Sequence, residues 1–459
     1  MGISDFTNGL MRGVGLGDPV IRLGVTGLSR AGKTVFITSL VANLMDRGRM
    51  PGLRAAADGS IKAAWLQPQP DDTVPRFEFE DHLAALTGPE PYWPEGTRHI
   101  SELRLSMRVQ PSGLLGGWRG PQVLHLDIVD YPGEWLLDLR LMERSYDQWS
   151  AEVLDRMPGR PMADEVLAAI AETDPDAPLD EPGARQLADL YAAHLQASRA
   201  AGWSDCTPGR FLLPGEMAGS PALTFAPLPP GPGKSPLRRE FARRYEAYKS
   251  RIVKPFFRDH FSRIDRQVVL VDVLGAIHAG PPALEDLRRT MGDILSAFNP
   301  GRMGWLAQML GLKRVERILF AATKADHLNH AQHSRLANIA LSLLRDARDR
   351  ADFAGARTEA MAIAALRTTT ETVIEQQGQS LPAVRGTLMD GRQAAFYPGE
   401  LPPDPAQLLV PAREGRREWL NGDYAAMAFR PAPDTARPGD GPPHIRLDRA
   451  AEFLIGDRL

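Results

Sequence analysis

Apolar residues along the chain fall into short continuous runs and one alternating stretch, the two patterns typical of strands. Continuous apolar runs predict buried strands at 20–25, 123–130, 268–274, 317–322 and 360–364. The alternation at 100–109 predicts a strand with one buried face. Because helical patterns separate most of these strands, we expect an α/β fold with a doubly wound, mostly parallel sheet of six strands.

The pattern changes between residues 136 and 262, where amphipathic stretches alternate with proline-rich joints that cannot continue a helix. These stretches predict helices at 148–157, 163–172 and 184–200. We therefore expect a helical insertion at 136–262, while residues 1–135 and 263–370 form the domain that contains the sheet. Residues 371–459 are expected to form a small C-terminal extension, with a hairpin that turns at Asp390-Gly391 and a terminal helix.

One further helix of the insertion is predicted to begin at Ser235-Pro236, an N-cap followed by proline in the first turn. An aromatic and aliphatic stripe follows at helical spacing, and the other faces carry arginine and lysine. These basic residues suit contact with acidic headgroups or an acidic partner. A solvated face on a helix packed within its own protein is the simpler interpretation. Pro255 is expected to end or kink this helix.

The first predicted strand leads into Gly27-Leu28-Ser29-Arg30-Ala31-Gly32-Lys33-Thr34, which fits the phosphate-binding pattern G-x-x-x-x-G-K-[ST]. A helix is predicted to follow, so its free N–H groups and its dipole would face phosphate oxygens. Lys33 is expected to reach the β- and γ-phosphates, and the Thr34 hydroxyl to bind Mg²⁺. The nucleotide-binding residues expected here are Gly27, Ser29, Arg30, Ala31, Gly32, Lys33, Thr34 and Val35.

The strand at 123–130 ends in Asp130-Tyr131-Pro132-Gly133, a D-x-x-G sequence. Ligands of open α/β sheets bind at the carboxyl ends of the strands. We therefore expect Asp130 to hold Mg²⁺, usually through a water, and the Gly133 N–H to touch the γ-phosphate. Thr97, just ahead of the strand at 100–109, is the candidate that senses Mg²⁺ and the γ-phosphate, with Thr73 and Thr87 as alternatives.

The strand at 317–322 runs into Thr323-Lys324-Ala325-Asp326, a form of the [NT]-K-x-D pattern that reads guanine. A carboxylate held edge-on accepts from the ring N1–H and the exocyclic amine, a donor pair that adenine lacks, and a lysine stem can lie along the base. After the strand at 360–364, a backbone N–H can donate to guanine O6. The residues expected to contact the base are Thr323, Lys324, Asp326, His327, Ala364, Ala365 and Leu366.

Composition excludes several kinds of binding and several kinds of site. The 54 basic and 57 acidic side chains give a net charge of −3, so no overall field recruits nucleic acid or anionic membrane. A single cysteine, Cys206, excludes an internal disulfide and a cysteine-cluster metal site. No apolar run approaches the roughly 20 residues that cross a bilayer, and 1–17 lack the pattern of an export signal. We therefore expect a cytoplasmic protein without a transmembrane segment.

The phosphate loop, the D-x-x-G strand, Thr323-Lys324-Ala325-Asp326 and Ala364-Ala365-Leu366, in this order, resemble Ras-like GTPases. More closely, the chain resembles the bacterial YcjX family, P-loop proteins with a Ras-like core, long insertions and stress-response associations. This closer resemblance spans nearly the whole chain. Besides the phosphate loop, it rests on Asp130-Tyr131-Pro132-Gly133-Glu134-Trp135, Ala321-Ala322-Thr323-Lys324-Ala325-Asp326-His327 and Pro443-His444-Ile445-Arg446-Leu447-Asp448.

The resemblance implies a role under stress and a membrane-anchored protein partner, which would hold a cytoplasmic protein peripherally at the inner membrane. Members of the family have also been labelled ATPases, so adenine specificity stays an alternative. The sequence leaves the oligomeric state open.

One departure from the Ras pattern concerns catalysis, because Glu134 follows Gly133 where many such enzymes have a water-orienting glutamine. This glutamate either polarises the water or contributes little. Arg30 either supplies positive charge to the transition state, caps the nucleotide or faces a partner. With Lys33 and Gly133 they form the candidate catalytic set. Unassisted Ras-type hydrolysis proceeds at about 10⁻⁴ per second, and we expect slow intrinsic turnover.

The sequence thus predicts a Mg²⁺-dependent switch that binds GTP and GDP and hydrolyses GTP. Two alternatives remain at this stage. One is an ATPase or P-loop kinase, and the other is a scaffold in which the nucleotide is structural.

Overall fold

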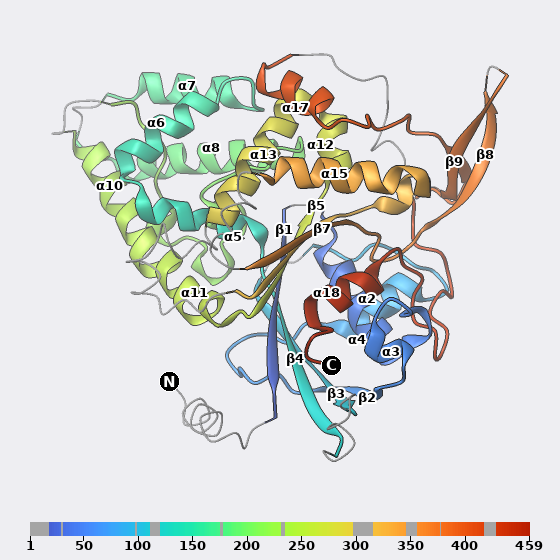
Figure 1. Cartoon of the computed structure of the whole chain (residues 1–459). Coiled ribbons are helices and arrows are strands. Elements are labelled where there is room, and N and C mark those ends of the chain that lie inside the picture. Colours follow the sequence, from blue (N-terminus) through green and yellow to red (C-terminus); the bar gives the residue numbers. More distant parts are fainter. Residues whose placement is uncertain are drawn as a thin grey trace.

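A computed structural model describes residues 18–459 except 29–30, 97–98, 111–119, 175–177, 231–234, 297–314, 346–355, 377 and 417–427. Its centre is one seven-stranded sheet in the order β2-β3-β4-β1-β5-β6-β7 (Figure 1). The strands are β1 Val20–Gly27, β2 Ile61–Gln67, β3 Ser101–Val109, β4 Gln122–Asp130, β5 Arg266–Val271, β6 Arg317–Ala322 and β7 Arg357–Ala362. From β4 to β7 neighbouring strands are parallel, whereas β2 and β3 run antiparallel to their neighbours.

The mostly parallel α/β sheet is as predicted, but the expected number of six strands is wrong. The unpredicted strand is β2, which pairs with β3 alone at the edge of the sheet. Of its residues only Ile61 is fully buried, so the segment carries neither an apolar run nor a clear alternation. An edge strand with little burial leaves a weak pattern in the sequence.

The strand predicted at 268–274 ends earlier, at Val271, because Asp272 caps a helix that was not predicted. The Asp272 side chain accepts a hydrogen bond from the Gly275 N–H at 2.9 Å. This bond satisfies a free donor in the first turn of α12 (Val273–Ala279). Helix α13 (Pro281–Ser296) follows.

Two apolar cores cover the two faces of the sheet. One face packs against α2 (Lys33–Met45) and the C-terminal α18 (Leu447–Ile455), and the other against α12, α13 and α15 (His333–Leu343) (Figure 1). Strand β5 contributes to both, since Val268 and Leu270 belong to the first core and Val269 and Val271 to the second. Such burial on both faces explains the continuous apolar run of this strand.

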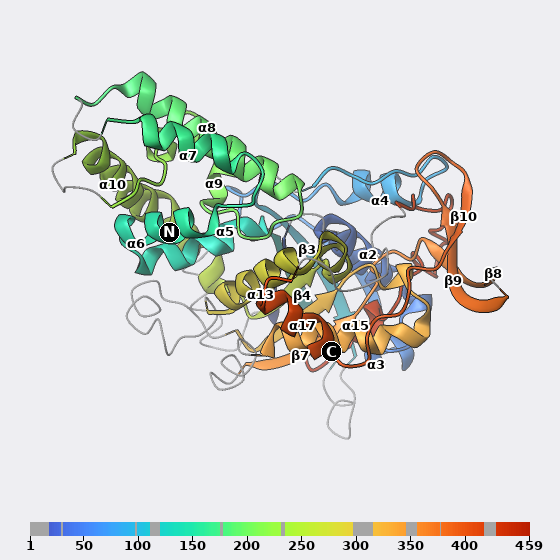
Figure 2. The same ribbon diagram turned by 90° about the horizontal axis from the view of Figure 1, so that it is seen from above.

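The helices predicted between 136 and 262 are present as α6 (Tyr146–Arg156), α7 (Ala163–Glu172) and α8 (Glu181–Ala200). Their apolar faces join the core on the β5–α13 side of the sheet, so this helical segment packs directly on the rest of the protein. Seen from above, it lies opposite the small sheet formed by β8, β9 and β10 (Figure 2). The boundaries 136 and 262 themselves stay a prediction.

The basic helix begins as predicted, with the Ser235 side chain accepting from the Arg238 N–H in the first turn of α10 (Pro236–Tyr248). Three of its cations, Arg238, Arg244 and Lys249, are buried, and they pair with Asp147, with Glu181 and Glu240, and with Glu246 respectively. They therefore serve the packing of the helical segment. Ahead of Pro255, a π-helical turn (Lys249–Val253) joins α10 to α11 (Lys254–Asp259), where a break or kink was expected.

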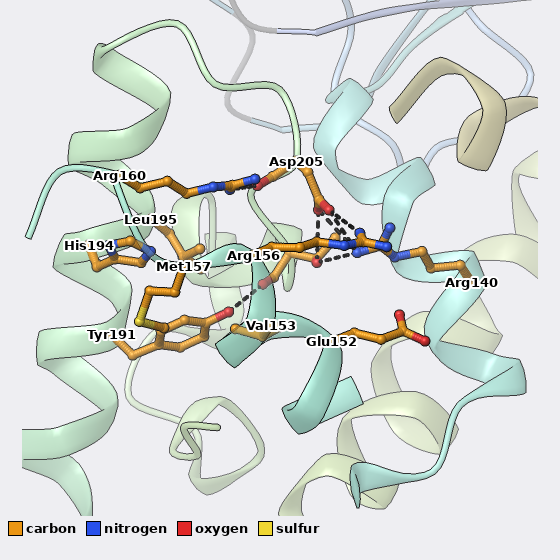
Figure 3. A pocket seen from close by; sticks show the side chains of 11 residues that line it. Arg140, Glu152, Val153, Arg156, Met157, Arg160, Tyr191, His194, Leu195 and Asp205 are labelled. Atoms are coloured by element: carbon orange, nitrogen blue, oxygen red, sulfur yellow. Dashed lines mark hydrogen bonds and ion pairs between the residues drawn. The ribbon is translucent and has the colours of Figure 1, made fainter. Parts of the chain in front are cut away.

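A buried ionic cluster ties the helical segment to α13. The Asp205 carboxylate lies between the guanidinium groups of Arg140 and Arg156, at 2.9 Å and 2.8 Å (Figure 3). Arg160 donates to the Asp205 carbonyl at 2.6 Å and pairs with Asp286 of α13 at 2.7 Å. Burial alone would raise the pKa of Asp205, but the surrounding arginines outweigh it and hold that pKa well below its usual range.

In the C-terminal extension the predicted hairpin is confirmed as β9 (Gln379–Thr387) and β10 (Gln393–Phe396), with Gly391 left-handed in the turn at φ +88°. A third strand, β8 (Thr369–Gln376), pairs with β9 and was not predicted. Helix α17 (Ala406–Arg413) and the terminal α18 complete the chain. No helix in the described part of the chain is long and apolar enough to span a membrane.

The joint between the sheet and the helical segment contains a buried carboxylate. Asp138 directly follows α5 (Gly133–Leu137) and accepts hydrogen bonds from the Gly209 N–H at 2.8 Å and from the Tyr248 hydroxyl. Burial raises the pKa of Asp138 to about 7. The folded protein therefore holds a proton on this group in the range where the unfolded chain has lost it.

We predict that Asp138→Asn makes the protein more stable than the parent, increasingly so from pH 5 to pH 8. Ionisation of the buried Asp138 lowers the parent's stability as pH rises from about 4 to about 7, by roughly 4 kcal/mol in total, whereas asparagine does not ionise. Melting temperatures of both proteins at several pH values measure this difference. Asp189→Asn, an exposed change on α8, is the control. A difference between Asp138→Asn and parent that does not change with pH would contradict the assignment.

Candidate nucleotide-binding site

The phosphate-binding loop joins the end of β1 to the start of α2, as predicted. Gly32 caps α2 in the left-handed conformation, with φ +79°, which glycine adopts without strain. The Lys33 ammonium donates to the Gly27 carbonyl at 3.1 Å, so its side chain folds back over the loop. Ser29 and Arg30 lie outside the described residues.

Strand β4 brings the D-x-x-G sequence beside this loop. Val25 of β1 pairs with Asp130 of β4, and Asp130 is buried at the carboxyl end of its strand. A Cβ atom on Gly133 would lie 2.3 Å from the Gly27 carbonyl oxygen. The two loops therefore touch through their backbones at a point where only glycine fits.

Strands β6 and β7 deliver the residues predicted to read the base. Asp326 is 4% exposed, and its Oδ2 accepts from the Thr368 N–H at 2.9 Å and from the Thr368 hydroxyl at 2.7 Å. Lys324 is left-handed at φ +61°, and its ammonium pairs with the Asp272 carboxylate. These contacts hold the Asp326 carboxylate and the Lys324 side chain in place at the carboxyl end of β6.

One cavity of about 650 Å³ connects the two groups of residues. That volume is typical of small-molecule sites. The predicted residues that line it are Ala31, Gly32, Lys33, Thr34, Val35, Thr323, Lys324, Asp326, His327, Ala364, Ala365 and Leu366. Gly27, Asp130, Gly133 and Glu134 do not line the cavity; of these, Gly27 and Gly133 meet beneath the phosphate loop. Thr97 lies outside the described residues.

Several lining residues were not predicted. Trp93 donates from Nε1 to the Phe429 carbonyl at 2.9 Å, and the Phe429 ring meets the His327 ring edge-on at 5.5 Å. Trp93 lies in the loop ahead of Thr97, and a tryptophan at that place could have been predicted as a site residue from the sequence. No local pattern marked Phe429, Thr368 or Asp272, because each contacts a site residue far from it in sequence: His327, Asp326 and Lys324 respectively. The other unpredicted lining residues are Phe36, Pro94, Gly96, Arg199, Leu213, Gly275 and Ala428.

The residues present fit a Mg²⁺ ion. Thr34 lies in the first turn of α2 and Asp130 at the carboxyl end of the strand that pairs with β1, so neighbouring elements supply a hydroxyl and a carboxylate on either side of the phosphate loop. Mg²⁺ prefers oxygen ligands and usually takes one or two from protein, with waters and phosphates completing its shell. The described residues contain no cluster of three or more His, Cys, Asp or Glu side chains suited to a metal.

The chain matches the YcjX-like family, DUF463, over residues 21–459. It belongs to the YcjX-like family. It is similar to the Ras-like GTPase YcjX of Escherichia coli K12, with 38% identity over 467 residues that cover 96% of each protein. It is also 34% identical to the Ras-like GTPase YcjX of Shewanella oneidensis over 471 residues, which cover 96% of this chain and 95% of that protein.

In this YcjX-like protein the helical segment also contacts the D-x-x-G loop. Glu134 is 2% exposed and forms an ion pair with Arg199 of α8, with 3.0 Å between Oε1 and Nη2. A Cβ atom on Gly209 would lie 2.4 Å from the Glu134 carbonyl oxygen. The D-x-x-G loop is thus held between the phosphate loop and the helical segment.

We predict that Gly133→Ala weakens GDP binding by about 5- to 150-fold, the equivalent of the roughly 1–3 kcal/mol that overpacking costs. The added methyl group would force the D-x-x-G loop away from Gly27 and distort the phosphate loop. Isothermal titration with GDP measures the effect. Gly292→Ala is the matched control, since a Cβ there meets nothing within 4 Å. Equal GDP affinity for parent and Gly133→Ala would show that the two loops do not depend on this contact.

Proposed function

We propose that this YcjX-like protein is a Mg²⁺-dependent switch that binds GTP and GDP and hydrolyses GTP slowly. The observation that carries the proposal is the single cavity lined by the phosphate loop and by Asp326 with the 364–366 turn. The name Ras-like GTPase, borne by both relatives, supports the same function.

The preference for guanine rests on Asp326. A carboxylate held by Thr368 keeps a fixed orientation, and guanine offers it two donors that adenine lacks. Lys324, whose ammonium is engaged by Asp272, leaves its alkyl stem to contact the base. The Ala364 N–H donates to the Ile445 carbonyl at 3.1 Å, so the N–H groups of Ala365 and Leu366 are the ones that would recognise guanine O6.

At the other end, Lys33 and the N–H groups at the start of α2 bind the phosphates, and Thr34 and Asp130 would hold Mg²⁺. When bound, this ion offsets the negative charge of the β- and γ-phosphates. Glu134 is buried outside the cavity lining and pairs with Arg199, so it would orient the attacking water only if its side chain turned toward the cavity. Gly133 would donate its N–H to the γ-phosphate. Loss of that phosphate would release the D-x-x-G loop, and because this loop also touches Gly209, the change would reach the helical segment.

Three proposals rest on the family resemblance alone: a role under stress, a membrane-anchored protein partner, and a cytoplasmic location that is peripheral at the inner membrane. The division into a Ras-like domain (1–135 and 263–370), a helical insertion (136–262) and a C-terminal extension (371–459) is proposed with them.

We predict that Lys33→Ala abolishes detectable binding of GTP and GDP, because the cradle loses its charge-assisted hydrogen bonds to phosphate. Thr34→Ala should mainly weaken the Mg²⁺-dependent part of binding. Titration with and without Mg²⁺ separates the two effects, and Lys62→Ala, at an exposed lysine of β2, controls for the loss of a charge. Retention of GDP affinity by a folded Lys33→Ala protein would exclude a phosphate-loop function.

We predict that Asp326→Asn shifts preference from guanine to xanthine nucleotides, since the amide replaces an acceptor with a donor. Competition of GTP, xanthosine triphosphate and ATP for the parent and the variant gives the selectivity directly. ATP binding to the parent as tight as GTP binding would favour the ATPase alternative. Transfer of phosphate to a second substrate would favour the kinase. Absence of turnover with tightly bound nucleotide would favour the scaffold.

A further inference from the structure

Arg199, in the last turn of α8, lines the nucleotide cavity from the helical segment. Two other cations line this cavity in the described part of the chain. Lys33 belongs to the phosphate loop, and Lys324 pairs with Asp272 at the end where the base is read. Arg199 therefore brings positive charge to the site from outside the sheet.

A chain of contacts locates Arg199 at the phosphate end. Its Nη2 lies 3.0 Å from Oε1 of Glu134, the residue after Gly133. Gly133 in turn packs against the Gly27 carbonyl, and the same carbonyl accepts from the Lys33 ammonium at 3.1 Å. Arg199 is thus three contacts away from the lysine that would hold the β- and γ-phosphates.

The Arg199 guanidinium still has donors to offer. Its pair with Glu134 is made through Nη2, whereas the buried Nε and both carboxylate oxygens of Glu134 make no hydrogen bond to any residue that the structure describes. The Arg199 side chain is 30% exposed, whereas the Glu134 side chain is 3% exposed. An arginine carries five N–H donors in a rigid fork suited to phosphate oxygens, so the ion pair with Glu134 leaves part of that fork for a ligand.

Hydrogen bonds to α13 hold the end of α8, which carries Arg199. Immediately after α8, the N–H groups of Ser204 and Asp205 donate to one oxygen of Asp286 in α13, at 2.6 Å and 3.0 Å. Asp205 also sits in the buried arginine cluster described above. The end of α8 is therefore anchored to the helix layer that covers the sheet.

We propose that Arg199 is an arginine finger that the helical segment supplies in cis to the γ-phosphate, with Glu134 as the residue that positions it. This inference rests on the proposed GTPase function. In hydrolysis the water oxygen bonds to the γ-phosphorus while the bond to the β–γ bridging oxygen breaks, and that oxygen leaves on GDP with the electron pair. One proton of the water ends on the inorganic phosphate, and the other is released to the solvent. Arg199 donates to the oxygens on which negative charge grows.

The first test is single-turnover GTP hydrolysis by the full chain. An arginine finger contributes about 10³- to 10⁵-fold to the rate. A switch with its arginine in cis turns over at about 10⁻² per second, so we expect Arg199→Ala to slow turnover by at least about 20-fold, to the roughly 10⁻⁴ per second of unassisted Ras-type hydrolysis. Arg199→Lys should be as impaired, since lysine keeps the charge but not the planar fork. GDP affinity should be unchanged in both, and Arg185→Ala, at an exposed arginine of the same helix, should hydrolyse GTP like the parent.

A second readout separates the transition state from the ground state. GDP with aluminium fluoride mimics the planar phosphoryl group, and its binding should be weakened by Arg199→Ala far more than the binding of GDP alone. Equal loss for both ligands would reduce Arg199 to a residue of general nucleotide binding and overturn the proposal.

A third arm asks whether Arg199 merely neutralises the buried Glu134. In a Glu134→Gln background that charge is gone, so a purely structural Arg199 becomes dispensable. We expect Arg199→Ala to abolish the residual turnover there as well. Recovery of turnover in the double variant would overturn the proposal.

The outcomes also distinguish this inference from the proposed function. A parent that hydrolyses GTP while Arg199→Ala does so equally well refutes the finger and leaves the GTPase intact. Loss of turnover in Arg30→Ala together with full turnover in Arg199→Ala would assign the role to the phosphate loop. A parent that binds GTP without hydrolysing it refutes the GTPase itself.

Discussion

Parallel hydrogen bonding of β1 between β4 and β5 is the constraint on which the rest of the site depends. In a parallel sheet the carboxyl ends of neighbouring strands lie at one edge, so the loops that follow them meet there. The phosphate loop, the D-x-x-G loop and the base-reading segments follow β1, β4, β6 and β7 and are separated by up to about 340 residues of sequence. The pairing of the strands brings the phosphate loop and the base-reading segments to one cavity and places the D-x-x-G loop against the phosphate loop.

The close approach of backbones then couples this edge to the helical segment. Gly133 packs on the carbonyl of Gly27, and Gly209 packs on the carbonyl of Glu134, so the D-x-x-G loop has no room to move independently of either neighbour. Because both contacts are closely packed, a displacement of the D-x-x-G loop at the phosphate loop also displaces its contact with the helical segment. This geometry gives a physical route by which the state of the nucleotide would be passed to α8 and α9 (Gly209–Leu212).

The helical segment contains several buried ion pairs, although the chain as a whole is nearly neutral. The arginines of α10 and of the Asp205 cluster are buried against carboxylates, where a broken pair costs far more than an intact pair contributes. The pairs of α10 join helices of the segment to one another, and the Asp205 cluster is joined to α13 through the pair between Arg160 and Asp286. Net charge predicts behaviour toward nucleic acid and membrane, but it carries no information about such internal pairing.

The sequence by itself determined the elements whose signal is local. The phosphate loop, the D-x-x-G sequence and the Thr323–Asp326 motif could be predicted because each lies within a few consecutive residues beside an apolar strand. The strands buried on both faces, such as β5 and β6, were predicted for the same reason, and the hairpin at Gly391 followed from a short turn signal.

Only the tertiary structure decided which distant side chains complete the site. Thr368 orients Asp326, Phe429 meets His327, and Arg199 reaches Glu134 across more than 60 residues. No periodicity marks such residues, because their role depends on where the chain returns in space. Strands β2 and β8 were not predicted, because few of their side chains are buried and their apolar pattern is therefore weak. Pairing with a neighbouring strand stabilises them instead.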